Sequence, residues 1–436
     1  MKYCNWSLIL FLIVLQAFCC LNTKSQSRKL AIQEIKEINA NEIKSGEKIV
    51  AITDVIIIDG NGKTPILNGT VIIRGNKIEQ AGIASAISIP ANAEVVHAKG
   101  MSVLPGLIDS HFHLDKMDGL PALFLQHGVT SVRDPGAWIE AYDSERKSGK
   151  MIPRLFLTGP HLDMYPPAYP DDAVIVRDST EAIEQVKKLA AQGATAVKIY
   201  FRIPAGMIRQ ICNKVHEYGL PVTAHLEIAE AIQAIEAGLD GIEHVTSFGQ
   251  SLIPPHAAEQ YRQSVLRDND ARKQGRYDVW KLIDINSGKA DSVCRYVAAR
   301  KIFISPTLGA FEYQPTADKT DTTKLVAFHN MEAFTAKLKK AGARIVLGSH
   351  SSIPYAEYGW AYQREMELLA ESGLSNSEII VASTMENARY FRIDKKLGSI
   401  EKGKLADLVL VRGNPLTDIK SMRNIEKVML NGIWVQ

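Results

Sequence analysis

Residues 179–200 read STEAIEQVKKLAAQGATAVKIY, and this stretch holds one full unit of the pattern that decides the fold. Its first part, STEAIEQVKKLAAQG, has the apolar spacing of an amphipathic helix, and its last part, AVKIY, is a short apolar strand. Residues 229–238 repeat the helical pattern, and Gly238 ends it as a C-cap. Helices that alternate with short strands are typical of βαβ units around a parallel sheet.

The same alternation recurs through residues 105–396, where eight short apolar segments are predicted as strands. They are residues 106–113, 128–134, 154–159, 196–200, 221–226, 241–245, 302–308 and 344–350. Eight strands with intervening helices predict an α/β fold of the (β/α)₈ TIM-barrel type. The longer and more charged residues 261–281 are expected to form an elaborated helical loop near the barrel mouth.

Both ends of the chain differ from this central part. Residues 48–104 contain β-branched runs separated by Gly and Asn, and residues 397–436 return to strand character. Neither segment has enough apolar surface to fold alone, so together they are predicted to form one small β-sandwich domain. Residues 28–47 are charged and are interpreted as a leader, a linker or a short helix.

The N-terminal residues 1–27 have the layout of a signal peptide. Lys2 precedes an apolar run in residues 8–18, which is too short to span a membrane, and a polar segment follows. We therefore expect an exported protein, periplasmic or secreted, with no transmembrane segment in the mature chain. Cys19 and Cys20 leave a lipoprotein anchor open, whereas a mature chain with Cys212 and Cys294 lacks a disulfide framework.

Composition excludes some partners. The 436 residues carry 51 Lys+Arg and 48 Asp+Glu, a formal net charge of +3, which does not favour nucleic acid or an anionic membrane. A small-molecule substrate is expected, and a homo-oligomer stays open.

Candidate metal ligands lie at the ends of the predicted strands, which is the active-site face of such a barrel. His111 and His113 are two residues apart and point the same way on a strand, and Lys198, His225 and His244 end three further strands. One buried strand histidine is more often a hydrogen-bonded core residue than a ligand. Four of eleven histidines at strand ends of one barrel instead favour a metal site.

These residues lie within motifs that resemble the amidohydrolase superfamily, in the group of imidazolonepropionase-like proteins and Xaa-Pro or Xaa-Arg dipeptidases. The motifs include VLPGLIDSHFHLD (103–115), GVTSVRDPG (128–136), VTAHLE (222–227), GIEHVT (241–246) and GSIEKGKLADLVLVRGNPLTDI (398–419). The resemblance implies one or two divalent ions, with zinc expected. It implies that His111 and His113 bind one ion, that His225 and His244 bind the second, and that a carboxylated Lys198 bridges them.

His350 departs from the family pattern, because the eighth strand of these enzymes normally ends in an aspartate that binds metal and accepts a proton from water. Three interpretations remain open. His350 ligates metal or acts as the general base. Alternatively, the metal centre persists but hydrolysis is impaired, and the protein binds rather than cleaves. In the third, another carboxylate serves, and the nearest is Glu357.

His161 and Tyr200 are weaker candidates for contact with substrate, since each follows a predicted strand and each could equally be solvated or packed. Together these features predict a metal-dependent amidohydrolase that cleaves amide-type C–N bonds of a dipeptide-like or cyclic-amide molecule. The alternative is a catalytically impaired binding protein on the same fold.

Overall fold

The structure, a computed structural model, describes residues 35–114, 118–316 and 320–435. The predicted signal peptide and the first part of the predicted linker lie outside these residues. No helix within the described ranges has the length and apolar content needed to cross a membrane.

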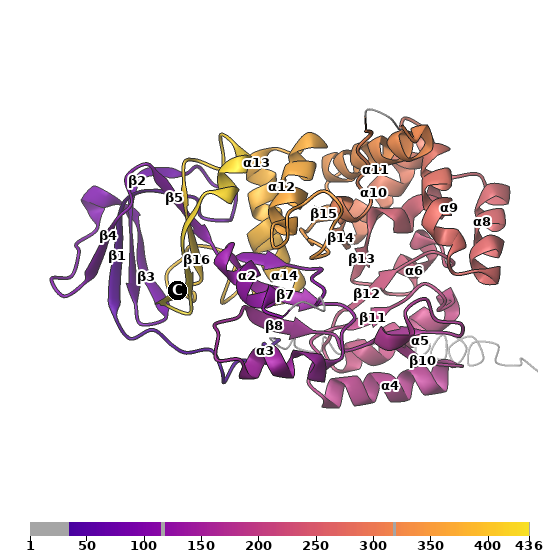
Figure 1. Cartoon of the computed structure of the whole chain (residues 1–436), viewed down its shortest axis with the longest axis horizontal. Helices are drawn as coiled ribbons and strands as arrows, with labels where there is room; N and C mark the ends of the chain where they lie inside the picture. Colours follow the sequence, from indigo (N-terminus) through magenta and orange to yellow (C-terminus); the bar gives the residue numbers. More distant parts are fainter. Residues whose placement is uncertain (1–34, 115–117, 317–319, 436) are drawn as a thin grey trace, which may run out of the picture. The chain divides into compact units, whose positions relative to one another are not determined.

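All eight predicted strands are present in the α/β region, residues 106–395 (Figure 1). They are β6 (Leu107–Asp109), β7 (Val129–Asp134), β8 (Arg154–Leu157), β11 (Val197–Ile199), β12 (Val222–His225), β13 (Gly241–Glu243), β14 (Phe303–Ser305) and β15 (Arg344–Ile345). Two short strands, β9 (His161–Asp163) and β10 (Ala173–Ile175), pair with one another, and β9 also pairs with β11. Every pairing in this region is parallel, so it has the predicted α/β class.

The parallel strands are assigned to two sheets, β6-β7-β8 and β10-β9-β11-β12-β13-β14-β15. Backbone hydrogen bonds join the two sheets at both edges of the three-stranded sheet. The amide of Thr195, just before β11, donates to Leu157 O at 2.8 Å, and the amide of Ser110 donates to Leu347 O at 3.0 Å. The first bond places the start of β11 beside the end of β8, and the second places residues after β6 beside residues after β15.

Helices connect the strands, and α4 (Ser179–Ala191) shows why they form. The side chain of Asp178 accepts hydrogen bonds from the amides of Thr180 and Glu181, which caps the helix start. Its buried residues, Ala182, Val186 and Leu189, are spaced by four and three and so form one stripe against the core.

Further helices follow the same alternation. They are α5 (Ala205–Glu217), α6 (Ala231–Glu236), α10 (Gly288–Arg300), α11 (Thr322–Lys340) and α12 (Ala361–Glu371).

The predicted helical loop between β13 and β14 contains two helices, α8 (Pro255–Arg267) and α9 (Ala271–Lys281). We call residues 255–281 the insertion. Its buried residues include Val265, Val279 and Trp280, of which Trp280 packs edge-on against Phe334 of α11. The insertion is therefore fixed to the α/β region by apolar packing.

Strands from both ends of the chain share one eight-stranded sheet. Its main order is β18-β17-β16-β5-β1-β2-β3, and β4 pairs with β1. These strands are β1 (Ile49–Ile57), β2 (Ile66–Arg74), β3 (Lys77–Ile83), β4 (Glu94–His97), β5 (Met101–Pro105), β16 (Leu408–Arg412), β17 (Ile425–Leu430) and β18 (Ile433–Trp434). β16 runs antiparallel to β5, and Figure 1 shows the yellow strand β16 beside the purple strands of the first segment. The sheet encloses its own apolar cluster, which includes Ile52, Val71, Val103 and Leu410.

A polar cluster holds the C-terminal strands against the α/β region. We call Glu37, Arg154, Asp407 and Asn431 the junction cluster. Arg154 of β8 donates to both carboxylate oxygens of Asp407 at 2.7 and 3.1 Å and also pairs with Glu37. Asn39 bonds the backbone on both sides of Arg154 as well. Residues 35–47 contain turns and no helix, so the short helix that was one interpretation of the linker is absent from its described part.

Candidate active site

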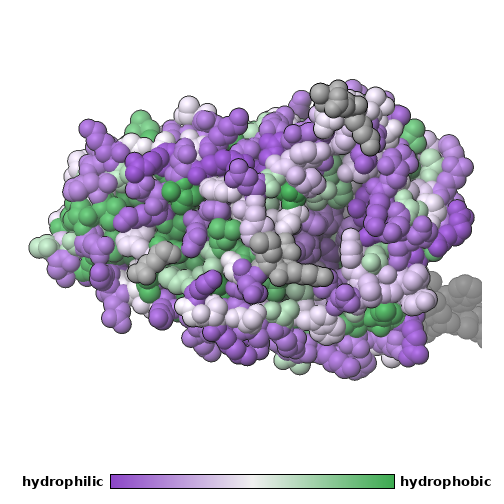
Figure 2. Space-filling view, in the orientation of Figure 1, coloured by the Kyte–Doolittle hydropathy of each residue, from purple (hydrophilic) through white to green (hydrophobic). Residues whose placement is uncertain are grey.

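A cavity of about 460 Å³ lies at the carboxyl ends of the parallel strands. Figure 2 shows this face of the molecule hollowed among hydrophilic residues. All eight predicted site residues line the cavity: His111, His113, His161, Lys198, Tyr200, His225, His244 and His350. They come together because the ends of neighbouring parallel strands meet at the same edge.

His111 and His113, which follow β6, point toward each other. Their Nε2 atoms are 3.1 Å apart. Two nitrogen ligands on one tetrahedral zinc ion, each about 2.0–2.1 Å from it, would be about 3.3 Å apart. The two imidazoles therefore have a spacing suited to sharing one ion.

In each of the four predicted histidine ligands, one ring nitrogen faces an oxygen atom of the protein. The pairs are His111 Nδ1 with Glu243 at 2.7 Å, His113 Nδ1 with Asp134 at 3.6 Å, His225 Nε2 with Glu227 at 2.9 Å and His244 Nδ1 with Thr307 at 2.6 Å. Such contacts fix the tautomer and orientation of metal-binding histidines. The other nitrogen of His225, Nδ1, is buried and has no hydrogen-bond partner. These rings fit a metal site, since each keeps one nitrogen available for an ion.

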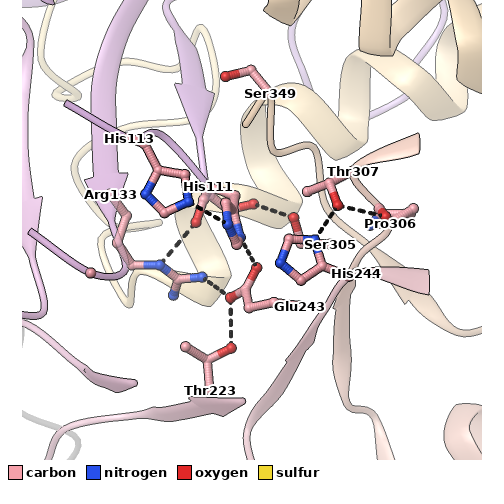
Figure 3. Close-up of polar contacts among 12 residues, drawn as sticks. His111, His113, Arg133, Thr223, Glu243, His244, Ser305, Pro306, Thr307 and Ser349 are labelled. Atoms are coloured by element: carbon pink, nitrogen blue, oxygen red, sulfur yellow. Dashed lines mark hydrogen bonds and ion pairs between the residues drawn. The ribbon is translucent and has the colours of Figure 1, made fainter. Parts of the chain in front are cut away.

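Glu243 organises the polar contacts beneath His111 (Figure 3). This fully buried carboxylate accepts from Arg133 at 2.9 Å and from Thr223 at 2.6 Å, and it pairs with His111. Arg133 also donates to Ser110 O, and its guanidinium lies 4.0 Å from the centre of the Tyr390 ring. We call Glu243, Arg133, Thr223, Tyr390 and His111 the site cluster.

His350 lies among the predicted ligands. Its ring stacks on His111 at 5.3 Å between centroids and meets His113 edge-on at 4.8 Å. One ligand atom each from His111, His244 and His350 lies within 4.8 Å of the other two. This trio differs from the pairing that the family resemblance implies, because it joins residues assigned there to two different ions. His350 thus occupies a position from which it could reach either a metal or a water molecule.

The backbone at His350 is held in a rarely used conformation. His350 has φ +60°, and its amide donates to His111 O at 2.7 Å. His244 also has a positive φ, +66°. Such left-handed residues cost about 1–3 kcal/mol each and concentrate at functional sites.

Asp109 and Ser349 connect the two segments that carry His111 and His350. The buried Asp109 carboxylate accepts from the Ser349 hydroxyl at 2.5 Å and from the amides of Ser349 and His111 at 3.0 Å. Burial outweighs these hydrogen bonds and raises the pKa of Asp109 to about 6. The carboxylate therefore holds the segments that carry His111 and His350 side by side.

Lys198 lies in β11 and is 2% exposed. Burial lowers the pKa of its amine from 10.5 to about 8, although the Glu243 carboxylate acts in the opposite direction. With this pKa about one amine in ten is neutral at pH 7.

His161 and Tyr200 form one wall, with ring centroids 4.4 Å apart. Burial and the charge of Lys198 lower the pKa of His161 to about 3, so this imidazole is neutral. His161 Nε2 is buried without a hydrogen-bond partner. Both rings are thus placed to contact a ligand in the cavity.

Carboxylates offer little support for the third interpretation of His350. Glu357 is not among the cavity residues, whereas Asp134 and Asp172 are. Asp134 already accepts from three backbone amides and from the Tyr142 hydroxyl. Its oxygens are therefore engaged in positioning the loop after β7.

Several charged residues at the site were not predicted from the sequence. Glu243 and Glu227 stand beside expected ligands in GIEHVT and VTAHLE, so proximity to a ligand was an available signal. Arg276 reaches the cavity from α9 of the insertion, and only the packing of that helix brings it there.

Comparisons with known proteins identify the family and the fold. The model of the amidohydrolase family matches residues 102–435. A solved structure of a candidate prolidase from Bifidobacterium longum is 24% identical, with a TM-score of 0.69 over 89% of this chain and 95% of that one. A Xaa-Pro dipeptidase with methionine in its active site is 21% identical, with a TM-score of 0.68 over 89% and 99%.

Molinate hydrolase is 20% identical, with a TM-score of 0.67 over 90% of this chain and 96% of that one. At such identities these structures show a shared fold. No curated protein sequence matches the chain.

Proposed function

Because the chain belongs to the amidohydrolase family, we propose that it is a metal-dependent hydrolase that cleaves an amide-type C–N bond of a small molecule. The observation that carries the proposal is the set of four imidazoles at one cavity, each with one ring nitrogen facing a protein oxygen. Protein groups with fixed tautomers and a shared cavity are what a catalytic metal centre requires.

His111 and His113 would hold one divalent ion, and His225 and His244 the second, with zinc as the expected metal. Lys198, once carboxylated, would bridge the two. Its lowered pKa, about 8, supports this assignment, because carbon dioxide adds to a neutral amine and not to an ammonium group. A bound ion would polarise the amide carbonyl and acidify a water molecule.

His350 would act on the proton. The water oxygen adds to the carbonyl carbon as the C–N bond breaks, and the water proton passes through His350 to the leaving nitrogen. Burial and the nearby His113 lower the pKa of His350 to about 3, so the imidazole is neutral and able to accept a proton. His161 and Tyr200 would contact the substrate beside it.

The substrate would be small, because a cavity of about 460 Å³ suits a ligand of a few residues at most. The names of similar structures include a Xaa-Pro dipeptidase, molinate hydrolase and a bottromycin amidohydrolase. We propose a dipeptide-like or cyclic-amide substrate.

Two proposals concern the fold, and the first rests on membership of the amidohydrolase family. We propose that the eight parallel strands close into a (β/α)₈ barrel, which the hydrogen bonds from both edges of the three-stranded sheet support. We also propose that the sheet of the two chain ends curls into a β-sandwich around its own apolar cluster. An experimental structure with an open row of strands would contradict the first.

The test is turnover by the full chain loaded with Zn²⁺, Mn²⁺ or Co²⁺ in bicarbonate buffer. The substrates are dipeptides, N-acyl amino acids and lactams. We expect hydrolysis of at least one class and its loss after chelation. Metal binding without turnover of any substrate would contradict the proposal.

A second candidate function is ligand binding without catalysis, and one observation favours it. A pKa of about 3 makes His350 a weak proton acceptor, and it stands where relatives are expected to carry an aspartate. This candidate predicts calorimetric binding of library members that the metal-loaded protein leaves intact.

The N-terminal proposals need a separate experiment. We propose that the chain is exported, with a lipid anchor at Cys19 or Cys20 open. Mass spectrometry of the mature protein from its native host would contradict export by finding an intact N-terminus.

A further inference from the structure

We infer that the substrate carries a carboxylate and that Arg276 binds it. The inference rests on the proposed function, because it concerns the same cavity, and it narrows the substrate to N-acyl amino acids and dipeptides. Lactams without an acid group would then be poor substrates.

Arg276 is placed within reach of the reaction. It projects from α9 of the insertion and lines the cavity beside the predicted ligands. Its Nη2 atom is 3.2 Å from His225 Nε2, and its guanidinium carbon is 5.6 Å from the centre of the Phe311 ring. The guanidinium is thus about one imidazole width from the nitrogen that His225 would offer to an ion.

A buried carboxylate fixes the orientation of Arg276. Its Nε donates to Glu227 Oε1 at 2.5 Å, and Tyr261 donates to the other oxygen of Glu227 at 2.5 Å. Arg276 is thus paired with a buried carboxylate inside the site. A side chain anchored through Nε presents its terminal edge at little further entropic cost.

The terminal edge of Arg276 has unused donors. A guanidinium has five N–H groups, and Nε–H is the one that meets a carboxylate in the described residues. If His225 keeps Nδ1 for an ion, its Nε2 carries a proton and donates to Glu227 at 2.9 Å. That nitrogen then cannot accept from Nη2, so the terminal N–H groups have no acceptor among the described residues, and Arg276 lines the cavity.

A carboxylate is the ligand that this edge fits. Two parallel N–H···O bonds from a guanidinium match the two oxygens of a carboxylate. Asp134, one of the two acids that line the cavity, is engaged by backbone amides. An acid one residue from the scissile amide would span the short distance from the predicted ligands to Arg276.

A purely structural reading of Arg276 makes a different prediction. An arginine that only neutralises Glu227 would affect stability and would not discriminate between charged and neutral ligands. Binding selectivity therefore separates the two readings.

The experiment is calorimetry on the full-length metal-loaded protein with two probes that lack a hydrolysable amide. N-methanesulfonyl-L-leucine carries the carboxylate, and N-methanesulfonyl-L-leucinol replaces it with a neutral alcohol. We expect the acid to bind about 10- to 100-fold more tightly, the usual range for hydrogen bonds to charged groups. In Arg276→Met we expect this preference to disappear.

Three further variants keep the result interpretable. The double variant Glu227→Gln/Arg276→Met removes both charges, so no buried charge is left unpaired, and it should also lose the preference. Arg276→Lys should retain part of it. Arg262→Met, a surface change in α8 of the same insertion, should keep it in full, since Arg262 pairs with Glu259 outside the cavity.

Equal affinity of the wild type for both probes, or an undiminished preference in the folded double variant, would overturn the inference. These outcomes are distinct from failure of the proposed function, because binding is measured without turnover. A protein that hydrolyses no library member but prefers the acid through Arg276 would refute the hydrolase and retain the carboxylate site.

Discussion

The site cluster and the junction cluster are built from the same chemistry, a buried carboxylate paired with a buried arginine. In the site cluster Glu243 meets Arg133, and in the junction cluster Asp407 meets Arg154. Both carboxylates are almost inaccessible, at 0% and 3% exposed. The two clusters differ in the groups that receive or donate their other hydrogen bonds.

The junction cluster is closed by protein on every side. Asp407 also accepts from the amide of Asn431, and Arg154 also donates to the Asn431 side chain. The site cluster is open, because Glu243 holds one nitrogen of His111 while the other nitrogen lies in the cavity. A closed cluster contributes to folding. The open cluster instead fixes the orientation of His111, whose free nitrogen can bind a ligand in the cavity.

The largest effect is expected from breaking the closed cluster. Asp407→Ala leaves Arg154 with less compensation in a buried place, and we expect the free energy of unfolding to fall by about 3–5 kcal/mol. Metal content per folded molecule should stay unchanged. Urea denaturation with metal analysis of the folded fraction checks both.

The apolar double variant Arg154→Met/Asp407→Leu is the control for this change. It should recover most of the stability, since replacing both partners removes the unpaired charge. A loss of metal in Asp407→Ala would show that the two clusters are not independent.

The next effect is the pH dependence of stability, which Lys198 near the site cluster should cause and the junction cluster should not. Folding lowers the pKa of Lys198 from 10.5 to about 8, so between these values the unfolded chain binds more protons than the native one. Stability of the metal-free protein without bicarbonate should therefore rise with pH across this window, by about 3 kcal/mol. Unfolding of wild type and Lys198→Met, measured from pH 8 to 10.5, gives the difference.

Arg154→Met is the matched comparison, because arginine stays charged throughout this range. It should show the same pH slope as the wild type. A slope that persists in Lys198→Met would mean that other lysines cause it.

Much of the fold could be predicted from the sequence, because the eight strands carry their own periodic signal. The α4–β11 unit was expected over residues 179–200, and the structure has α4 at Ser179–Ala191 and β11 at Val197–Ile199. The family match confirmed the resemblance to amidohydrolases. The contacts of Glu37 and Asn39 with the α/β region could not be predicted, since they depend on single polar side chains.

The site was predictable where residues share a local signal and not where tertiary packing places them. The histidines could be predicted as site residues because they lie at the ends of predicted strands. Arg276 lies in a charged helix whose other charges face elsewhere, and only the burial of residues such as Trp280 fixes which side faces the cavity. Glu243 stands beside His244, which was an available signal, but the sequence alone does not distinguish a buried acid from an exposed one.

A smaller effect should follow from loosening the open cluster. Glu243→Gln keeps the shape of the side chain but weakens its hold on His111, and such changes beside a ligand reduce metal affinity about 10- to 100-fold. Competition with a chromophoric chelator measures it. Asp407→Asn, an equivalent change in the closed cluster, should leave affinity unaltered, and equal losses in both would remove the distinction between them.

The smallest effect is expected from His350→Asp, which tests whether His350 acts as the general base beside the site cluster. Both side chains can accept a proton from water, so the exchange should retain part of the catalysis that a general base supplies. Aspartate restores two oxygens and a negative charge and also tolerates the φ of +60° at this position, but it is shorter than histidine and reaches less far into the cavity.

We expect about a tenfold loss of turnover from this exchange, well below the 10²- to 10⁴-fold that a missing base costs. The parent and the variant are to be compared on the same amide substrates across a range of pH. A large gain instead would identify His350 as the residue that impairs an inherited hydrolase, which is the binding-protein alternative. An unchanged rate would exclude His350 from proton transfer. Replacing an imidazole by a carboxylate at the reacting centre is expected to change the rate.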